Sequence, residues 1–275
     1  MTDRLGDTAH TRIVDSPAAY TRAVPEPGRN FVVTGCGRSA TNYTASLLSE
    51  LGVRCGHEAV FTPFTTAFAG FGDWQGDSSW LAVPFLGALP AGTVVLHQVR
   101  DPEAVVSSFV GIRFFADDGT TARRDLRSRL QIARARGVKG TLQRLTSSSG
   151  RERAQRKRSD FVAFLREHCA EAFAEPTERA RAARHWVAWN RAAARADENP
   201  QLVYARYRVE DLGAPLVTEL LATLELDITS AAVEAAVAHL PNTANTRPRR
   251  EDQDDTPVVS YDGVKELAAE YGYSL

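Results

Sequence analysis

The hydrophobic positions of this chain fall into short apolar runs that alternate with longer stretches of helical spacing. The first run, residues 31–34 (FVVT), is rich in β-branched residues and stops at glycine, as expected for a buried parallel strand. Similar patterns predict strands over 93–99 and 202–209. Because helical stretches separate these runs, the pattern predicts an α/β fold with three layers around a central, mostly parallel sheet.

Helices are predicted where apolar residues recur every three to four positions. One follows the first strand, from about Tyr43 to Leu51. Another is expected from Pro102 through Phe109, because Asp101 is a suitable N-cap and proline suits the first helical position. The same spacing predicts helices over 161–173, 178–196, 215–225 and 231–240. In the 178–196 helix, one apolar stripe contains Ala182, Trp186, Trp189 and Ala193.

Charge and composition divide the chain into segments. Residues 1–29 are polar and end in a Pro- and Gly-rich stretch, which predicts a flexible N-terminal arm before one domain over 30–250. Within that domain, 113–158 holds 14 Lys and Arg against four acidic residues, so we expect a basic helical lid or insertion at about 113–160. A pair of solvated helices without a role in binding is the structural alternative. Residues 251–275 hold seven acidic residues and one lysine, and are predicted to form an acidic C-terminal segment.

The whole-chain composition excludes several classes of protein. With 43% hydrophobic residues among 275, the chain can bury a sizeable core, and its net charge of -1 does not suit a polycation that coats nucleic acid. Its three cysteines lack CxxC spacing, so neither a disulfide framework nor a zinc site is expected. The longest weakly polar run, 80–92, is too short to span a bilayer, and the start of the chain does not resemble a signal peptide. We therefore expect a cytoplasmic protein.

The loop between the first strand and the first helix carries the most informative residues. Glycines there leave backbone N–H groups open to a ligand, and the following helix directs the positive end of its dipole at the loop. Arg38 adds a planar cation that can hold a tetrahedral anion. The loop therefore predicts a phosphate or sulfate site, with a tight turn and a capped helix as the structural alternative. The site residues would be Gly35, Gly37, Arg38, Ser39, Ala40, Thr41 and Asn42.

A second anion-binding pair follows the strand predicted over 93–99. Arg100 lies at the carboxyl end of that strand, where open α/β sheets bind ligands. Ser108 comes eight residues later. It should lie about two helical turns, or roughly 9 Å, from the helix start, and an extended arginine covers much of that span. We expect both side chains to hold one phosphate group.

The glycine loop resembles the 5′-phosphosulfate-binding loop of sulfotransferases that use 3′-phosphoadenylyl sulfate (PAPS). That loop commonly reads G-x-x-[RK]-[ST]-G-T-[ST], and the matching positions here are Gly35, Arg38, Ser39 and Thr41. The chain departs from the motif at Ala40, where the family usually has glycine, and at Asn42. If Ala40 must take a positive φ, the loop is strained by ~1 kcal/mol or more.

Arg100 and Ser108 are similar to the family's motif for the 3′-phosphate, R-[DN]-P with a serine eight residues after the arginine. The resemblance implies a P-loop NTPase-like sulfotransferase fold over 30–250. It also implies PAPS as co-substrate and adenosine 3′,5′-bisphosphate (PAP) as product, without a metal. The acceptor would be a hydroxyl of a small molecule, a carbohydrate or a lipid. A basic loop near the end of the domain offers two further phosphate ligands, Arg247 and Arg249.

The segment after the first helix supplies the candidates for a catalytic base. Residues 54–58 (RCGHE) resemble the RCG-x-E segment in which tyrosylprotein and bacterial carbohydrate or lipid sulfotransferases place a catalytic glutamate. The resemblance makes Glu58 the first candidate and His57 the second, with a surface pair in a loop as the structural alternative. Arg38 is the candidate for stabilising charge on the leaving phosphate oxygen, with help from Thr41.

Other polar and aromatic residues near these motifs have simpler interpretations. His97 lies within a strand and is expected to be a core histidine with its own hydrogen-bond partners. Residues 77–80 are assigned only a minor role on the acceptor side. A group of phenylalanines could form either an apolar acceptor wall or part of the core: Phe61, Phe64, Phe68 and Phe71.

Two other functions are open on the sequence alone. A P-loop kinase that uses Mg-ATP shares the order of strand, loop and helix, but the GxxxxGK[ST] loop is missing here. A non-catalytic nucleotide- or RNA-binding protein would use the basic segment as its binding surface. Few aromatic residues occur over 119–158, which argues against base stacking, so we do not expect a nucleic-acid partner.

Overall fold

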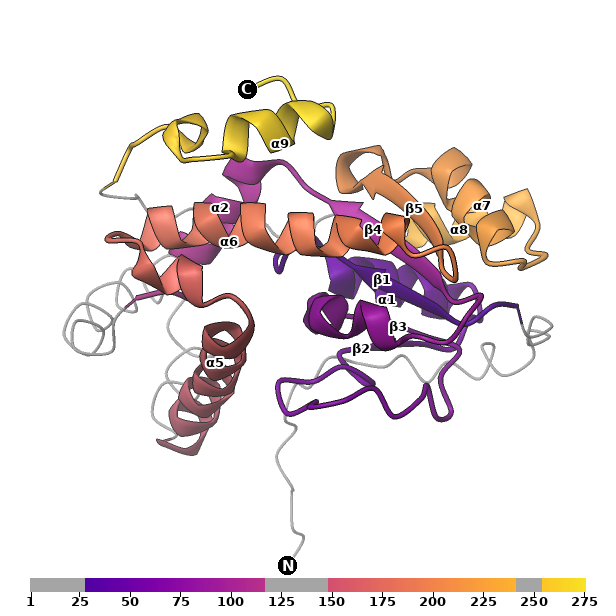
Figure 1. Cartoon of the computed structure of the whole chain (residues 1–275). Helices are drawn as coiled ribbons and strands as arrows, with labels where there is room; N and C mark the ends of the chain where they lie inside the picture. The colour runs from indigo at the N-terminus through magenta and orange to yellow at the C-terminus, as the bar shows by residue number, and fades with distance from the viewer. Residues whose placement is uncertain (1–27, 117–147, 241–253) are drawn as a thin grey trace, which may run out of the picture.

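Five parallel strands form the sheet of this protein. The computed structural model describes residues 28–116, 148–240 and 254–275, with 148–157 as backbone alone. The strand order is β2-β3-β1-β4-β5 (Figure 1), so β1 is central, and it pairs with β3 and β4. The strands are β1 (Phe31–Thr34), β2 (Cys55–His57), β3 (Gly76–Ser78), β4 (Val94–Val99) and β5 (Val203–Arg208).

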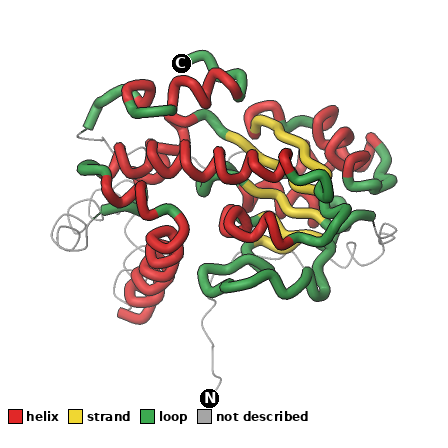
Figure 2. The backbone as a smooth tube through the Cα atoms, in the orientation of Figure 1, coloured by secondary structure: helices red, strands yellow, loops and turns green. Residues whose placement is uncertain are grey.

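Helices flank this sheet and follow its strands along the chain. The α-helices are α1 (Thr41–Glu50), α2 (Pro102–Gly111), α5 (Ser148–His168), α6 (Glu178–Ala194), α7 (Ala214–Thr223), α8 (Ser230–His239) and α9 (Val264–Glu270). Short 3-10 helices are η2 (Trp80–Ala88), η3 (Ala170–Ala174), η4 (Arg195–Glu198), η5 (Val209–Asp211) and η6 (Val258–Ser260). In Figure 2, α6 crosses in front of the strands.

The two faces of the sheet bury two separate sets of side chains. Along β1, Phe31 and Val33 pack into one core with residues of α1, α7 and α8. Val32 points to the opposite core, which contains residues of η2, α2, α6 and α9. This alternation follows from the period-2 geometry of a strand that is buried on both sides. A parallel sheet with helices on both faces confirms the predicted α/β class.

The topology creates a switch point between β1 and its neighbour β4. The helix after β1 is α1, which packs on one face of the sheet, whereas α2, which follows β4, packs on the other. The two connections therefore leave the carboxyl ends of adjacent strands in opposite directions. Open α/β sheets bind ligands in the crevice at such a point. The glycine loop and the segment that begins at Arg100 both start there.

Most of the predicted elements are present, and the differences concern one helix and three short elements. The strands predicted over 93–99 and 202–209 are β4 and β5, and the four-residue stripe of α6 is buried as expected. The prediction of one continuous helix over 161–173 is wrong at Cys169. The backbone dihedral angles of Cys169 are not helical, so this residue separates α5 from η3. Sequence patterns did not predict the short strands β2 and β3, nor α9.

The end of the chain packs onto α6. Val258, Val264 and Leu267 join the core that α6 faces. The buried Arg179 of α6 donates to the backbone oxygen of Thr256 at 2.7 Å and to the Glu103 carboxylate at 2.5 Å, so it links this segment to α2. The residues predicted as a flexible arm lie outside the described part, apart from 28 and 29, and so does most of the basic segment.

Among the described residues, no helix is both long enough and apolar enough to cross a membrane.

Candidate functional site

The loop between β1 and α1 is shaped by close backbone contacts. Gly35 has φ +151°, and a Cβ atom there would lie 2.1 Å from the backbone oxygen of Gln98, so only glycine fits. At Gly37, a Cβ would lie 3.1 Å from the Phe109 ring and 3.4 Å from the Trp80 ring. The Gln98 side-chain amide donates to the backbone oxygen of Ser39. The loop is therefore fixed by β4 on one side and by aromatic rings on the other.

The N-terminus of α1 is left open toward this loop. Its N-cap position is held by Ala40, whose methyl group cannot cap a helix, and the first turn contains no acidic residue. The N–H groups of a first helical turn lack intrahelical partners and favour an anion. The Ser39 hydroxyl is buried and has no hydrogen-bond partner among the described residues. Burying a hydroxyl without a hydrogen bond lowers the stability of the fold by ~1–3 kcal/mol, and a hydrogen bond to a ligand or a water molecule would recover this energy.

The two predicted anion-binding segments meet at Arg38. Its Nε donates to the Ser108 hydroxyl at 2.9 Å, and Arg100 Nη1 donates to the Arg38 backbone oxygen at 2.9 Å. The Trp186 indole donates to the backbone oxygen of Arg100 at 3.1 Å and fixes that residue from α6. Among the described residues, no carboxylate forms an ion pair with Arg100. The structure thus brings together residues that are about 60–70 positions apart in the chain.

His57 and Glu58 lie beside this cluster, at the end of β2. His57 is exposed, with Nε2 3.4 Å from the Thr41 hydroxyl at the start of α1. Glu58 is half-buried, and the indole N–H of Trp80 donates to its Oε1 at 3.1 Å. Because the ring of Trp80 also faces Gly37, one indole contacts both the glycine loop and the candidate base. Both candidates for the base therefore lie near the glycine loop.

Backbone strain is concentrated at this place. In the described part of the chain, five non-glycine residues have positive φ, and three of them are Arg38 (72°), Ala40 (67°) and Glu58 (53°). Ala40 has a positive φ, which is the condition under which the sequence predicted strain in this loop. Non-glycine residues with a positive φ are strained and persist only where the surrounding structure holds them. Such residues are enriched at functional sites.

A buried polar network that the sequence did not reveal supports the glycine loop. The Gln98 side-chain oxygen accepts from the Thr44 hydroxyl at 2.5 Å and from the Tyr207 hydroxyl at 2.6 Å. Its amide nitrogen donates to the glycine loop, so Gln98 connects α1 and β5 to that loop. The sequence feature that could have revealed this network is a glutamine within a strand that is otherwise largely apolar. The neighbouring His97 is a satisfied core histidine, as predicted, bonded to Tyr204 and Asn190, and burial lowers its pKa to about 4.

The other predicted residues differ in their outcome. Arg247 and Arg249 lie outside the described residues. Asn42 is exposed in the first turn of α1. Phe61 and Phe71 are core residues, with Phe68 packed between them, while Phe64 is 72% exposed. The phenylalanine group is thus mainly core.

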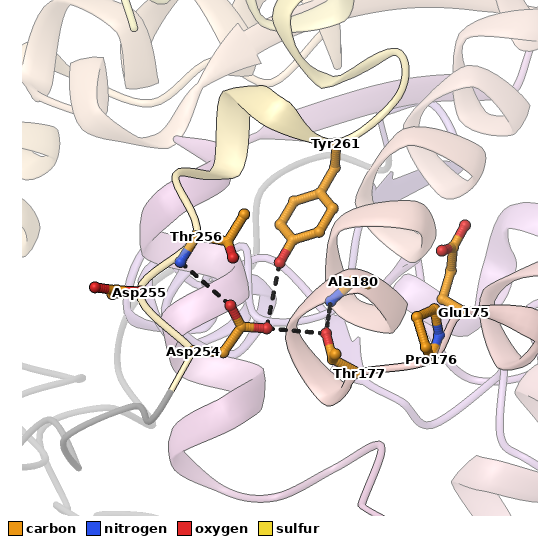
Figure 3. A pocket seen from close by; sticks show the side chains of 8 residues that line it. All are labelled: Glu175, Pro176, Thr177, Ala180, Asp254, Asp255, Thr256 and Tyr261. Atoms are coloured by element: carbon orange, nitrogen blue, oxygen red, sulfur yellow. Dashed lines mark hydrogen bonds between the residues drawn. The ribbon is translucent and has the colours of Figure 1, made fainter.

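A separate pocket of about 540 Å³ lies where the C-terminal segment meets α6 (Figure 3). The Asp254 carboxylate in its wall accepts hydrogen bonds from the Thr177 and Tyr261 hydroxyls. None of the residues that line this pocket belongs to the predicted site.

No family model, curated protein or solved structure matches this chain. Within the described ranges, no group of three or more His, Cys, Asp or Glu side chains is arranged to hold a metal ion.

Proposed function

We propose that this protein is a sulfotransferase that moves a sulfuryl group from PAPS to a hydroxyl of a small-molecule, carbohydrate or lipid acceptor. The observation that carries the proposal is the chain of contacts from Arg100 through Arg38 to Ser108. It joins the loop expected to hold the 5′-phosphosulfate to the pair expected to hold the 3′-phosphate. A nucleotide with phosphates at both positions is the ligand that such an arrangement suits.

The residues present fit the phosphate groups of PAPS. The open N-terminus of α1 and the unpaired Ser39 hydroxyl offer donors to one anionic group. Arg100 and Ser108 offer a guanidinium and a hydroxyl to a second. Bound PAPS would supply the activated sulfuryl group. Arg247 and Arg249 stay proposed as additional phosphate ligands.

The remaining residues have roles in proton and charge transfer. A bond forms between the acceptor oxygen and sulfur, the bond from sulfur to the 5′-phosphate oxygen breaks, and PAP leaves. Glu58, held by Trp80, would take the proton of the acceptor hydroxyl, and His57, whose ring lies beside the start of α1, is the second candidate. Arg38 would stabilise the charge that develops on the leaving oxygen. We expect this reaction to occur in the cytoplasm and to need no metal.

Nucleotide titration tests the proposal against its alternatives. PAP should bind tightly to the full chain without magnesium, and more tightly than ADP does. A preference for Mg-ADP would instead support a kinase, and binding of RNA without PAP binding would support the non-catalytic alternative. If PAP binds, mass spectrometry of reactions with PAPS and a panel of hydroxyl acceptors should show products that are heavier by one sulfuryl group.

A further inference from the structure

Asp77 is a buried carboxylate at the centre of the short strand β3. It lies between Val32 of β1 and Gly56 of β2 and has no exposed surface. Its Oδ1 accepts from the backbone N–H of residue 59 at 3.1 Å. Its Oδ2 accepts from the N–H groups of residues 60 and 61 at 3.1 and 3.0 Å. One carboxylate thus binds three consecutive amides of the loop that follows β2.

The surroundings of Asp77 are built to let it reach that loop. A Cβ on Gly56 would lie 2.8 Å from Asp77 Oδ1 and 2.7 Å from the Ala59 Cβ, so glycine leaves the space that the carboxylate uses. Burial raises the pKa of Asp77, while the three N–H donors and the nearby His57 act in the opposite direction. A buried carboxylate is costly unless it is hydrogen-bonded, and here the backbone supplies those bonds.

The loop that Asp77 holds begins directly after Glu58. Glu58 has φ 53°, a conformation that needs support from its neighbours. Asp77 holds the backbone on one side of Glu58, and Trp80 binds the Glu58 carboxylate. Two further residues of the same stretch act alike: the Ser79 hydroxyl donates to the Phe61 backbone oxygen at 3.0 Å, and the Ser78 hydroxyl donates to that of Thr41 at 2.8 Å. Residues 77–80 therefore connect the Glu58 loop to the start of α1.

We propose that Asp77 is the positioning residue for Glu58: by binding the amides of residues 59–61, it holds the candidate base at a fixed place beside the glycine loop. The inference rests on the proposed function for its catalytic consequence. Its structural part, the restraint of the loop by one carboxylate, is independent of that function. Asp77 itself is buried and does not reach substrate.

Graded variants of Asp77 test the catalytic part. Asp77→Asn keeps one acceptor oxygen, whereas Asp77→Ala removes all three bonds. We expect kcat to fall ~10-fold in Asp77→Asn, whose single oxygen can keep the two bonds made by Oδ2 as neutral hydrogen bonds. It should fall ~100-fold in Asp77→Ala, which keeps none of the three bonds. The affinity for PAP should stay within ~2-fold, since the phosphate-binding residues are untouched. Asp73→Asn, which changes an exposed carboxylate between β2 and β3, is the matched control and should retain wild-type kcat.

A double-mutant cycle separates positioning from a general loss of structure. If Asp77 acts through Glu58, Asp77→Asn should lower kcat little further in a Glu58→Gln background. If the two losses instead multiply, the inference is wrong although the sulfotransferase assignment stands. If the wild-type chain neither binds PAP nor transfers sulfate, it is the proposed function that fails.

Hydrogen exchange in the wild-type protein tests the structural part without any variant. The amides of residues 59–61 should exchange at least ~100-fold more slowly than those of residues 72 and 73, which lie in exposed loop. In folded Asp77→Asn this protection should fall by ~10-fold or more, with α1 unchanged. Unprotected amides at 59–61 in the wild-type protein would overturn the inference, even if the Asp77 variants fail to fold.

Discussion

Replacing His185 with phenylalanine should remove a large part of the protein's sensitivity to acid. His185 is fully buried in α6, among the rings of Trp80, Phe109, Phe115 and Trp189 at centroid distances of 5.1–6.1 Å. Neither of its ring nitrogens has a hydrogen-bond partner among the described residues. Burial lowers its pKa from 6.5 to about 3. The folded protein therefore holds this imidazole neutral, whereas the unfolded chain protonates it near its ordinary pKa.

The size of the effect follows from proton linkage. Between the folded pKa of about 3 and the unfolded value of 6.5, the unfolded state binds more protons, so the free energy of unfolding rises with pH. This contribution is complete above the unfolded value and is lost as the pH falls through the window. At about pH 5 the loss from His185 amounts to ~2 kcal/mol. His97, with its pKa lowered to about 4, acts in the same direction. The raised pKa of Asp77 opposes both at the acidic end.

Urea unfolding of the wild-type protein and His185→Phe at a series of pH values measures this term. The difference between the two free energies cancels the contributions of His97 and Asp77, which both proteins share. As the pH falls from about 7.5 to about 5, the free energy of unfolding of His185→Phe should rise by ~2 kcal/mol relative to that of the wild-type protein. Phe115→Leu disturbs the same cluster without removing a titratable group, and its stability difference should be the same at all these pH values. A His185→Phe difference that stays constant with pH would refute the reasoning.

Three further predictions concern the site directly. Arg38→Ala should abolish turnover, because its guanidinium would stabilise the leaving group; unchanged kcat would remove it from the mechanism. Glu58→Gln should lower kcat by ~10²–10⁴ with little change in PAP affinity, and a wild-type rate would move the role of base to His57. Ala40→Gly should relieve the left-handed conformation and raise the urea midpoint by an amount equivalent to ~0.5–1 kcal/mol, whereas Ala222→Gly, on an exposed face of α7, should lower it by a similar amount. Destabilisation by both glycines would contradict the strain at Ala40.

The long elements could be predicted because their sequences carry the signal locally. The strand β4 begins with the apolar run VVL and is buried along its whole length. The helix α2 begins where Asp101 accepts a hydrogen bond from the Ala104 N–H and Pro102 takes the first helical position. The stripe of α6 likewise reflects helical spacing toward one core. In each case local preference and tertiary packing agree, so the pattern is sufficient.

The elements that the sequence did not predict depend on tertiary pairing. β2 and β3 are three residues each, CGH and GDS, and the glycines and the aspartate among them have low strand propensity. They are strands because they pair with each other and, through β3, with β1. For the same reason Asp77 could not be identified as a buried anchor, since a Gly-Asp-Ser stretch usually indicates a turn.

The sequence could predict which loops of the candidate site would lie at the same edge of the sheet, but not the contacts between their side chains. The motifs around Arg38 and Arg100 indicated two anion-binding segments, and the parallel sheet places them at one edge. The link from Arg38 to Ser108 depends on the side-chain directions of a loop and a helix that are far apart in the chain. The contribution of Gln98 and Trp80 to the site likewise emerges only from packing.

The proposal that the two arginines hold opposite ends of one nucleotide is tested most directly by comparing affinities for PAP and adenosine 5′-phosphate in wild type and Arg100→Ala. The wild-type protein should prefer PAP by ~100-fold, because the 3′-phosphate gains charge-assisted hydrogen bonds. In Arg100→Ala this preference should fall to a few-fold while adenosine 5′-phosphate binds as before, and the exposed Arg54→Ala should behave as wild type. An Arg100→Ala protein that keeps the full preference for PAP, or a wild-type protein that shows none, would contradict the account.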